Sequence, residues 1–370
     1  MRIGVPKEIK LQEHRIGLTP ESVKILVNKG HEVLVENNGG FEAGFANEDY
    51  KKAGAKIENK ASDIFKKSDL IVKVKEPQNN EVEMIRENQI IYTYLHLAAA
   101  KKLTEGLIKS KSICIAYETV TDDNGRLPLL APMSAVAGRM SIQAGAHSLE
   151  KNQKGRGLLL GGAPGVESAN VVILGGGVVG ENAALIATGM RAKVYIVDKS
   201  KARLDQLKEI FGDKIIPEHS DKTDLKKLIS KCDLLIGGVL IPGAEAPKLV
   251  TREMIKSMKR GSVVVDVAID QGGCVETSKP TTHANPTYLV DDVVHYCVAN
   301  MPGGVPRTST MALNKATLPL LIKIADEGYE KTLKENKNYL AGLNVFKGNI
   351  TCKGVANAFG LKYLSPEKAL

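Results

Sequence analysis

The chain has 370 residues, 43% of them hydrophobic and 25% charged, which is typical of globular proteins and long enough for about two domains. Its formal charge of +9 is spread along the sequence and only 4% of the residues are aromatic, which argues against a stacking platform for nucleic acid and favours small anions as ligands. Five cysteines without close spacing predict neither a disulfide framework nor a zinc or other metal site, and they suit a reducing cytoplasm.

The first third of the chain alternates between strand-like and helix-like segments. Its charged beginning, MRIGVPKEIKLQEHR, lacks the apolar core of a signal peptide. Thr19 and Pro20 are a good helix start and Gly30 a good helix stop. Such alternation predicts a parallel sheet with helices on both faces. We expect strands at residues 2–5, 32–36, 70–75, 89–95 and 113–118, and helices at 19–29, 47–53 and 101–108.

The second part begins with an expected helix at residues 132–151, followed by the glycine-rich stretch GRGLLLGGAPG, which we interpret as a flexible hinge. The most apolar region, residues 158–179, contains Glu167 and Asn170 and is therefore no membrane span. The β/α pattern then repeats, before a long helix at 309–335 and a helical tail that we expect to have no strands and to pack on the first domain. The strands expected here are residues 171–174, 193–198, 234–237, 262–269 and 295–299.

The fold class that follows is α/β. We expect two Rossmann-like, doubly wound parallel-sheet domains with an interdomain cleft. One domain combines residues 1–128 with 307–370, and the other contains residues 129–306.

The strongest local motif is the sequence NVVILGGGVVGENAALIATGMRAKVYIVD at residues 170–198. It contains G-x-G-x-x-G as Gly175, Gly177 and Gly180, directly after an apolar strand and before a helical run. A second strand ends in Asp198, about 20 residues after Gly175. This order of strand, glycine loop, helix and strand is the βαβ context of a dinucleotide site. The glycines permit a tight turn, close approach of the pyrophosphate and close helix packing, while Asp198 favours NAD over NADP. Lys199 and Arg203 lie near enough to weaken that preference, and a purely structural turn is the alternative.

Polar residues follow several of the expected strands. Lys75 and His96 end or follow strands of the first domain, and Asp270 and Asn300 do so in the second. Ligands of open α/β sheets bind outside the carboxyl ends of the strands, so we expect these residues to converge on the cleft. Each also has an ordinary explanation: a core histidine, a solvated lysine, or a residue that forms a turn or cap.

These motifs together resemble the alanine dehydrogenase and transhydrogenase family, and within it the bacterial L-alanine dehydrogenases most. The resemblance rests on GVPKEIKLQEHRIGLTP at 4–20, KVKEP at 73–77, YLHLA at 94–98, LGGGVVG with Asp198, DVAIDQGG at 266–273 and NMPGGVPRTST at 300–310. It extends over essentially the whole chain. The family often has Asn-Glu at Gln12-Glu13 and Val-Ala at Ile16-Gly17; these departures flank Arg15 without replacing it.

The resemblance implies reversible, NAD-dependent oxidative deamination of L-alanine to pyruvate and ammonium. Arg15 and Lys75 would hold the substrate carboxylate, although a solvated arginine is the ordinary interpretation of Arg15. His96 and Asp270 would be the catalytic residues. His96 would exchange a proton with the oxygen at C2, and Asp270 would orient the amine and act as general base for water.

The family also implies a cofactor set and a homohexamer. Besides the three glycines, the cofactor-binding residues would be Ser134, Val178, Val179, Asp198, Arg203, Ser220, Val239, Leu240, Val267, Ala268, Ile269, Asp270, Lys279, Val298, Ala299, Asn300 and Met301. By itself, Ser134 is equally well a helix cap and Lys279 a solvated loop residue.

Three other functions stay open at this point. One is the soluble NAD(H)-binding subunit of a proton-translocating transhydrogenase, and a second is a saccharopine-type dehydrogenase that reduces a larger imine. The third is a non-catalytic nucleotide-sensing or scaffold protein with the same fold. Arg15 and Lys75 together with His96 and Asp270 favour small-molecule chemistry over the transhydrogenase subunit. The presence of all four polar residues at the strand ends argues against the non-catalytic protein.

Overall fold

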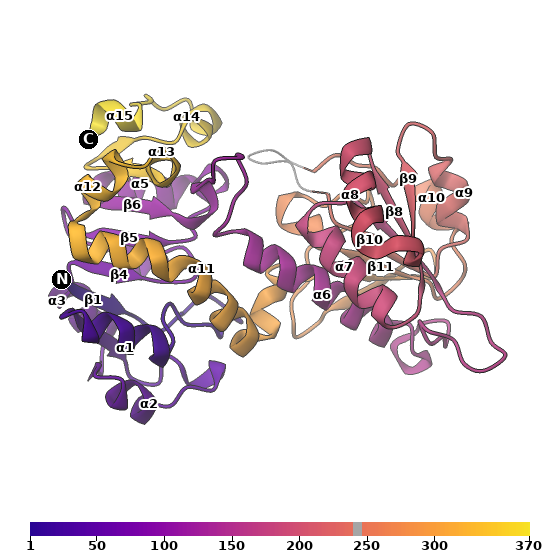
Figure 1. Ribbon diagram of the computed structural model, residues 1–370, viewed down its shortest axis with the longest axis horizontal. Helices are drawn as coiled ribbons and strands as arrows, with labels where there is room; N and C mark the ends of the chain where they lie inside the picture. Colours follow the sequence, from indigo (N-terminus) through magenta and orange to yellow (C-terminus); the bar gives the residue numbers. More distant parts are fainter. Residues whose placement is uncertain (240–245) are drawn as a thin grey trace. The chain divides into compact units, whose positions relative to one another are not determined.

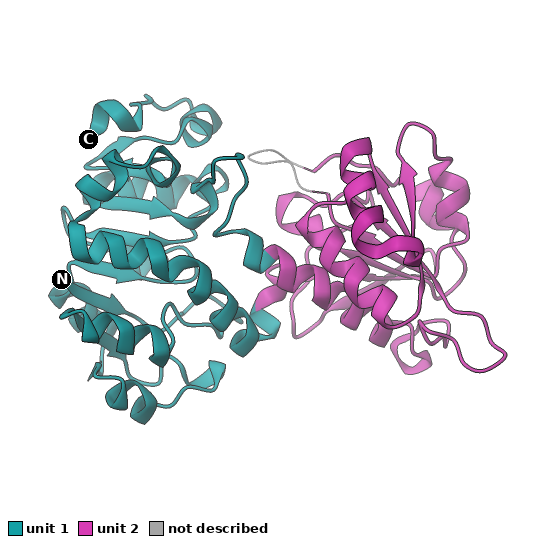
Figure 2. Ribbon diagram, in the orientation of Figure 1, with its two compact units in different colours: residues 1–133, 303–370 teal, residues 134–302 magenta. Residues whose placement is uncertain are grey.

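The computed structural model describes residues 1–239 and 246–370. The chain forms two compact units, which Figure 2 shows in different colours. Unit 1 contains Met1–Met133 and Gly303–Leu370, and unit 2 contains Ser134–Pro302. The chain therefore leaves unit 1, builds unit 2 and returns, and the C-terminal segment packs on the first unit as expected. Both units are α/β, which confirms the predicted fold class.

Unit 1 is built on an eight-stranded sheet in the order β15-β14-β6-β5-β4-β1-β2-β3. The six strands from the N-terminal segment pair in parallel, and the two from the C-terminal segment pair antiparallel. The strands are β1 (Arg2–Val5), β2 (Glu32–Glu36), β3 (Lys56–Glu58), β4 (Leu70–Val72), β5 (Ile90–Thr93), β6 (Ile113–Ala116), β14 (Leu343–Phe346) and β15 (Asn349–Ile350).

The helices of unit 1 come from both parts of the chain, as the colours of Figure 1 show. The long helix α11 (Pro306–Glu327) packs on the sheet, since the Tyr92 hydroxyl in β5 donates to the Thr317 carbonyl at 3.0 Å. The helices are α1 (Pro20–Asn28), α2 (Asn47–Lys52), α3 (Ala61–Lys67), α4 (Asn79–Val82), α5 (Lys101–Ser110), α11 (Pro306–Glu327), α12 (Tyr329–Lys334), α13 (Lys337–Leu340), α14 (Lys353–Phe359) and α15 (Pro366–Ala369), with 3₁₀ helices η1 (Phe41–Ala43), η2 (Leu97–Ala99) and η3 (Tyr117–Thr119).

The expectation of a strand-free C-terminal segment is wrong. β14 pairs with β6 and extends the sheet, and β15 pairs with β14 across a two-residue turn. The turn residues Lys347 and Gly348 have φ of 47° and 90°, which suits a tight hairpin. The long helix expected at 309–335 is likewise two helices, since α11 ends at Glu327 and Gly328 separates it from α12.

Unit 2 is built on a seven-stranded sheet in the order β12-β13-β11-β10-β7-β8-β9, parallel except for β12. Alternate residues of β7 pack into different core clusters: Val171 and Ile173 into one, Val172 and Leu174 into the other. Both faces of the sheet are therefore covered, as in doubly wound folds. The strands are β7 (Asn170–Leu174), β8 (Lys193–Asp198), β9 (Ile215–His219), β10 (Leu234–Gly237), β11 (Val263–Asp266), β12 (Thr287–Val290) and β13 (Val293–Tyr296).

The helices of unit 2 lie between these strands in the chain. They are α6 (Ala131–Ser148, whose first three residues belong to unit 1), α7 (Val178–Gly189), α8 (Lys201–Phe211), α9 (Leu225–Ser230) and α10 (Arg252–Ser257), with 3₁₀ helices η4 (Lys151–Gln153), η5 (Gly212–Lys214), η6 (Val267–Gln271) and, at the boundary, η7 (Met301–Gly304). None of the helices in the described parts of the chain is both long and apolar enough to span a membrane.

The glycine-rich stretch at 155–165 lies within unit 2, so it is no hinge between the units. Its backbone is tied down where the Arg156 amide donates to the Gly261 carbonyl at 2.9 Å and the Gly157 amide to the Leu149 carbonyl at 2.8 Å. A Cβ at Gly155 would lie 2.3 Å from backbone atoms at the end of α6, so glycine is needed there for close packing.

Candidate active site

His96 lies beyond β5 in a strained backbone conformation. Its φ is 49°, in the left-handed region that non-glycine residues rarely adopt. Glu118, just after β6, holds this turn: one carboxylate oxygen, Oε1, accepts the His96 amide at 2.6 Å and the Leu95 amide at 3.1 Å. The imidazole stacks on Tyr94 with 5.8 Å between ring centroids, and its Nδ1 is 4.0 Å from that Oε1. Because 47% of the side chain is exposed, His96 is not a core histidine.

Arg15 is a buried cation on the loop after β1. Its side chain is 2% exposed, and its Nε and Nη2 each donate to a different carboxylate oxygen of Glu13 at 2.6 Å. Burial disfavours the charge, but the hydrogen bonds and charge of Glu13 outweigh it, so that the pKa of Arg15 is above its ordinary value. A guanidinium held in this way stays charged and has a fixed orientation.

Lys75 lies three residues beyond the end of β4 rather than at the strand's last position. Its amide donates to Glu8 at 3.3 Å, and its carbonyl accepts from the Thr93 hydroxyl at 3.0 Å. The strands that precede Arg15, Lys75 and His96 are neighbours in the sheet, in the order β5-β4-β1. The three side chains therefore extend from adjacent loops at the carboxyl edge of one parallel sheet, where α/β proteins bind ligands.

Tyr94 links two of these groups. It stacks on His96, and the charge of Arg15 acts on its hydroxyl, although burial is the larger effect and raises the pKa of Tyr94 well above its ordinary value. Sequence reasoning missed Tyr94, Glu13 and Glu118. The sequence could have indicated Glu118, because it lies at the end of an expected strand as His96 does. For Glu13 the only indication was its position two residues before Arg15.

In unit 2 the glycine loop has the geometry that the motif predicts. Gly175 has φ of 94°, and a Cβ at Gly180 would lie 1.9 Å from the Gly175 carbonyl oxygen, so the start of α7 packs tightly on the end of β7. At Gly177, by contrast, such a Cβ would have no contact within 4 Å among the described residues beyond its chain neighbours. Packing therefore explains the first and third glycines, whereas the second leaves open space at the N-terminus of α7, as a pyrophosphate requires.

Asp198 and Arg203 both contact this loop. The Asp198 carboxylate, at the end of β8, accepts the Gly176 amide at 2.6 Å and the Ser200 amide at 2.8 Å. Arg203 donates from Nε to the Gly176 carbonyl at 2.6 Å and forms an ion pair with Glu181 on α7. Val178 and Val179 are the first two residues of α7. The residues present thus fit a dinucleotide with its phosphates on the helix N-terminus.

Asp270 does not end a strand as expected. β11 ends at Asp266, whose buried carboxylate accepts the amides of Ala268 and Val275 at 3.2 and 3.1 Å and thereby turns the chain into η6. This 3₁₀ helix contains Val267, Ala268, Ile269 and Asp270. The Asn300 amide donates to Asp270 Oδ1 at 3.3 Å, so the two predicted site residues lie together.

The other predicted cofactor residues are distributed over unit 2. The Ser220 amide, just after β9, donates to the Asp198 carbonyl at 3.1 Å, and the backbone of Val239 packs against Gly175. Lys279 is exposed, and its amide donates to the Tyr288 hydroxyl at 2.6 Å. Leu240 lies outside the described residues. Ser134 is in α6, while Val298, Ala299 and Met301 lie beyond β13 near Asn300.

Comparison with known proteins gives the same assignment for both parts of the chain. The N-terminal domain of the family described as "Alanine dehydrogenase/PNT" matches residues 4–137, and its C-terminal domain matches residues 141–353. An alanine dehydrogenase of Halomonas elongata is 55% identical over 98% of both chains, and one of Methanococcus maripaludis is 53% identical over 100% of both.

Solved structures agree with this assignment. A structure titled L-alanine dehydrogenase is 50% identical with a TM-score of 0.94, covering 97% of this chain and 99% of its own. A transhydrogenase from Sinorhizobium meliloti is 23% identical with a TM-score of 0.82, covers 95% of this chain and 100% of its own, and shares the fold. With both domains matched and relatives more than half identical over the full length, the chain belongs to the alanine dehydrogenase/PNT family.

Proposed function

We propose that the chain is an NAD-dependent L-alanine dehydrogenase: L-alanine + NAD⁺ + water ⇌ pyruvate + ammonium + NADH + H⁺. Its relatives with 52 to 55% identity are named alanine dehydrogenase. The observation that carries the proposal is the grouping of two cations and an exposed imidazole on adjacent loops of unit 1, in a chain whose unit 2 has a dinucleotide loop.

Arg15 and Lys75 would bind the carboxylate that alanine and pyruvate share. The guanidinium offers paired donors in a plane, and the ammonium adds a compact charge on a flexible stem. Glu13 occupies Nε and Nη2 of Arg15 and so orients the guanidinium. The two cations together would hold the substrate at one end and so define the position of C2.

His96 would hydrogen-bond the oxygen at C2 and exchange a proton with it as the carbinolamine forms and collapses. Glu118 holds the strained turn at His96, so the backbone from which the imidazole extends has a defined position. Asp270, held by the Asn300 amide, would orient the amine and accept a proton from the water that attacks the imine. A carboxylate suits both tasks, because it accepts hydrogen bonds and attracts ammonium.

NAD is the cofactor, and when bound it accepts the hydride from C2. The start of α7 would hold its pyrophosphate and Asp198 its adenosine ribose, with Gly175, Gly177, Gly180, Val178 and Val179 around the phosphates. The pairing of Arg203 with Glu181 leaves less of its charge for a 2′-phosphate, which supports NAD over NADP. The remaining cofactor residues inferred from the resemblance, Leu240 among them, are part of this proposal.

The interdomain cleft, a homohexamer and a cytoplasmic location are further parts of the proposal. The hexamer rests on the resemblance to the family, and light scattering tests it against six times the 39.8 kDa chain mass. The location rests on the cysteines, of which four are buried thiols.

The test follows the absorbance of NADH with pyruvate and ammonium added together, and with each left out. We expect consumption only with both. If NADH binds without turnover, the dehydrogenase proposal is wrong and a transhydrogenase subunit or a nucleotide sensor takes its place. Turnover that requires a larger 2-oxo acid and an amino acid in place of ammonium would instead indicate a saccharopine-type reaction.

A further inference from the structure

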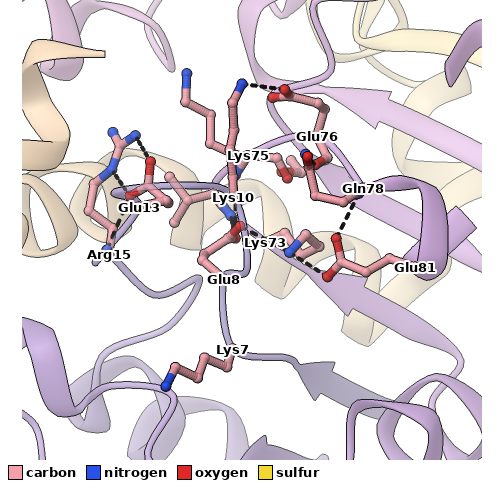
Figure 3. A network of polar contacts seen from close by, with 12 residues as sticks. Lys7, Glu8, Lys10, Glu13, Arg15, Lys73, Lys75, Glu76, Gln78 and Glu81 are labelled. Atoms are coloured by element: carbon pink, nitrogen blue, oxygen red, sulfur yellow. Dashed lines mark hydrogen bonds and ion pairs between the residues drawn. The ribbon is translucent and has the colours of Figure 1, made fainter. Parts of the chain in front are cut away.

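A buried cluster of three charges lies beside the predicted substrate loops and has no part in the mechanism above. Glu8, Lys73 and Glu81 are 5%, 0% and 1% exposed. The Lys73 ammonium donates to Glu8 Oε2 at 3.0 Å and to Glu81 Oε1 at 2.8 Å, as Figure 3 shows. Glu81 in turn accepts the Gln78 amide at 2.8 Å and caps α4.

Stability alone is a weak reason for such a cluster. Removing charges from water is costly, and apolar residues of the same volume often stabilise a fold as well or better. Burial by itself would lower the pKa of Lys73, but the two carboxylates outweigh it and raise that pKa, so the ammonium stays charged. The cluster is better explained by the groups whose position it fixes.

Glu8 connects two loops. It lies on the loop after β1, which also contains Arg15, and its Oε1 accepts the amides of Val74 at 2.6 Å and Lys75 at 3.3 Å on the loop after β4. The opposite side of this segment is also fixed, because the Tyr117 hydroxyl donates to the Lys73 carbonyl and the Thr93 hydroxyl to the Lys75 carbonyl, both at 3.0 Å.

We propose that Glu8 is a positioning residue: paired with Lys73 and bonded to the Val74 and Lys75 amides, it sets Lys75 relative to Arg15 for the substrate carboxylate. This inference rests on the proposed function. Glu8 does not contact the substrate. It acts through the backbone of Lys75, with Glu81 holding the other side of Lys73. The effect of Glu8 on pyruvate use must therefore depend on the Lys75 side chain.

The test is a double-mutant cycle between Glu8→Gln and Lys75→Met in the full chain. The new carboxamide has only one oxygen. If this oxygen accepts the two backbone amides, the NH₂ group faces the Lys73 ammonium, and if it faces Lys73, the two amides lose their acceptor. We expect Glu8→Gln alone to lower kcat/KM for pyruvate about tenfold, as for a lost hydrogen bond to a charged group. In the Lys75→Met background the same change should lower it less than about twofold, because the positioned group is gone. Rates at pyruvate concentrations far below KM give kcat/KM without saturation.

Two further measurements separate positioning from general destabilisation. The Kd of NADH should be unchanged in Glu8→Gln. The matched control is Asp233→Asn, which alters a carboxylate that is 4% exposed, accepts the Asn170 amide at 2.9 Å and pairs with Lys259, at the amino edge of the other sheet. It should lower the melting temperature without changing kcat/KM for pyruvate in the folded protein.

Equal losses in both backgrounds, or an unchanged kcat/KM in Glu8→Gln, would overturn the inference. If Glu8→Gln does not fold, Glu8→Asp keeps the charge but withdraws the carboxylate from the two amides, and the same cycle applies with the same outcomes. If the unaltered chain shows no turnover with pyruvate and ammonium, the proposed function fails instead. The two failures are therefore distinguishable.

Discussion

At the scale of single residues, the candidate site depends on carboxylates that hold other groups in place. Glu118 holds the backbone of His96, Glu13 orients Arg15, and Asp266 turns the chain toward Asp270. Each carboxylate accepts at least two hydrogen bonds, so its partners lose conformational freedom before any ligand binds. Preorganised groups of this kind are a general requirement of catalysis.

Replacement of His96 should separate chemistry from binding. We expect His96→Ala to lower turnover of pyruvate and ammonium by about 10²- to 10⁴-fold, the usual contribution of a general acid–base group. The Kd of NADH, measured by fluorescence titration, should not change, because no predicted cofactor group is removed. His147→Ala, on the exposed surface of α6, is the control and should retain full turnover. Full activity of His96→Ala would exclude the proposed role.

Asp198 should set the choice of dinucleotide. We expect Asp198→Asn to raise the ratio of kcat/KM for NADPH to that for NADH about tenfold or more, because the charge that repels a 2′-phosphate is lost. The asparagine oxygen can still accept the Gly176 or the Ser200 amide, so the loop retains part of its support. Asp205→Asn, on the exposed face of α8, should leave the ratio unchanged. The same ratio in both variants would place ribose recognition elsewhere.

At the scale of secondary structure elements, several strands, β4 and β5 among them, end two or three residues earlier than the sequence pattern predicts. β4 and β5 stop at Val72 and Thr93, before Lys75 and His96. The apolar pattern continues beyond these ends because residues such as Val74 and Leu95 remain buried in loops. The Tyr94 amide still donates to the Val74 carbonyl at 3.3 Å, so burial and some backbone pairing extend past the regular strands.

The glycine loop allows a test of three glycines near one helix. Gly180→Ala should lower the melting temperature and weaken NADH binding, because its Cβ would lie 1.9 Å from the Gly175 carbonyl. Gly177→Ala should weaken NADH binding by about tenfold or more with little effect on stability, because the space around it is left for phosphate. Gly189→Ala, at the other end of α7 and without close neighbours among the described residues, is the control. Normal NADH affinity in Gly177→Ala would contradict the phosphate site.

At the scale of the whole molecule, the proposed substrate groups and most of the proposed cofactor groups belong to different units. Arg15, Lys75 and His96 are in unit 1, whereas Asp270 and the glycine loop are in unit 2. Unit 2 is one continuous segment with its own sheet and core clusters. Unit 1 needs both ends of the chain, because β14 pairs with β6.

This division predicts that the second unit retains one function alone. A fragment of residues 131–302, which includes all of α6, should show a cooperative thermal transition and bind NADH. It should not consume NADH with pyruvate and ammonium, because it lacks Arg15, Lys75 and His96. A folded fragment without affinity for NADH would show that the cofactor site needs unit 1. The full chain measured in parallel is the control.

The sequence by itself determined the features that depend on neighbouring residues. The dinucleotide loop was predicted because strand, glycines, helix and Asp198 all lie within one βαβ unit. The exact limits of β1, β2, β8 and β10 followed from apolar runs between clear turn signals.

Only the tertiary structure decided the contacts between distant residues. Glu8 and Val74 are 66 residues apart, and His96 and Glu118 are 22 apart. The short strand β14 follows its partner β6 by more than half the chain. Local periodicity contains no information about which distant group completes a hydrogen bond, so the cluster around Lys73 and the C-terminal strands were not predictable. Charges are buried where a folded partner satisfies them, and that partner is known only once the chain has folded.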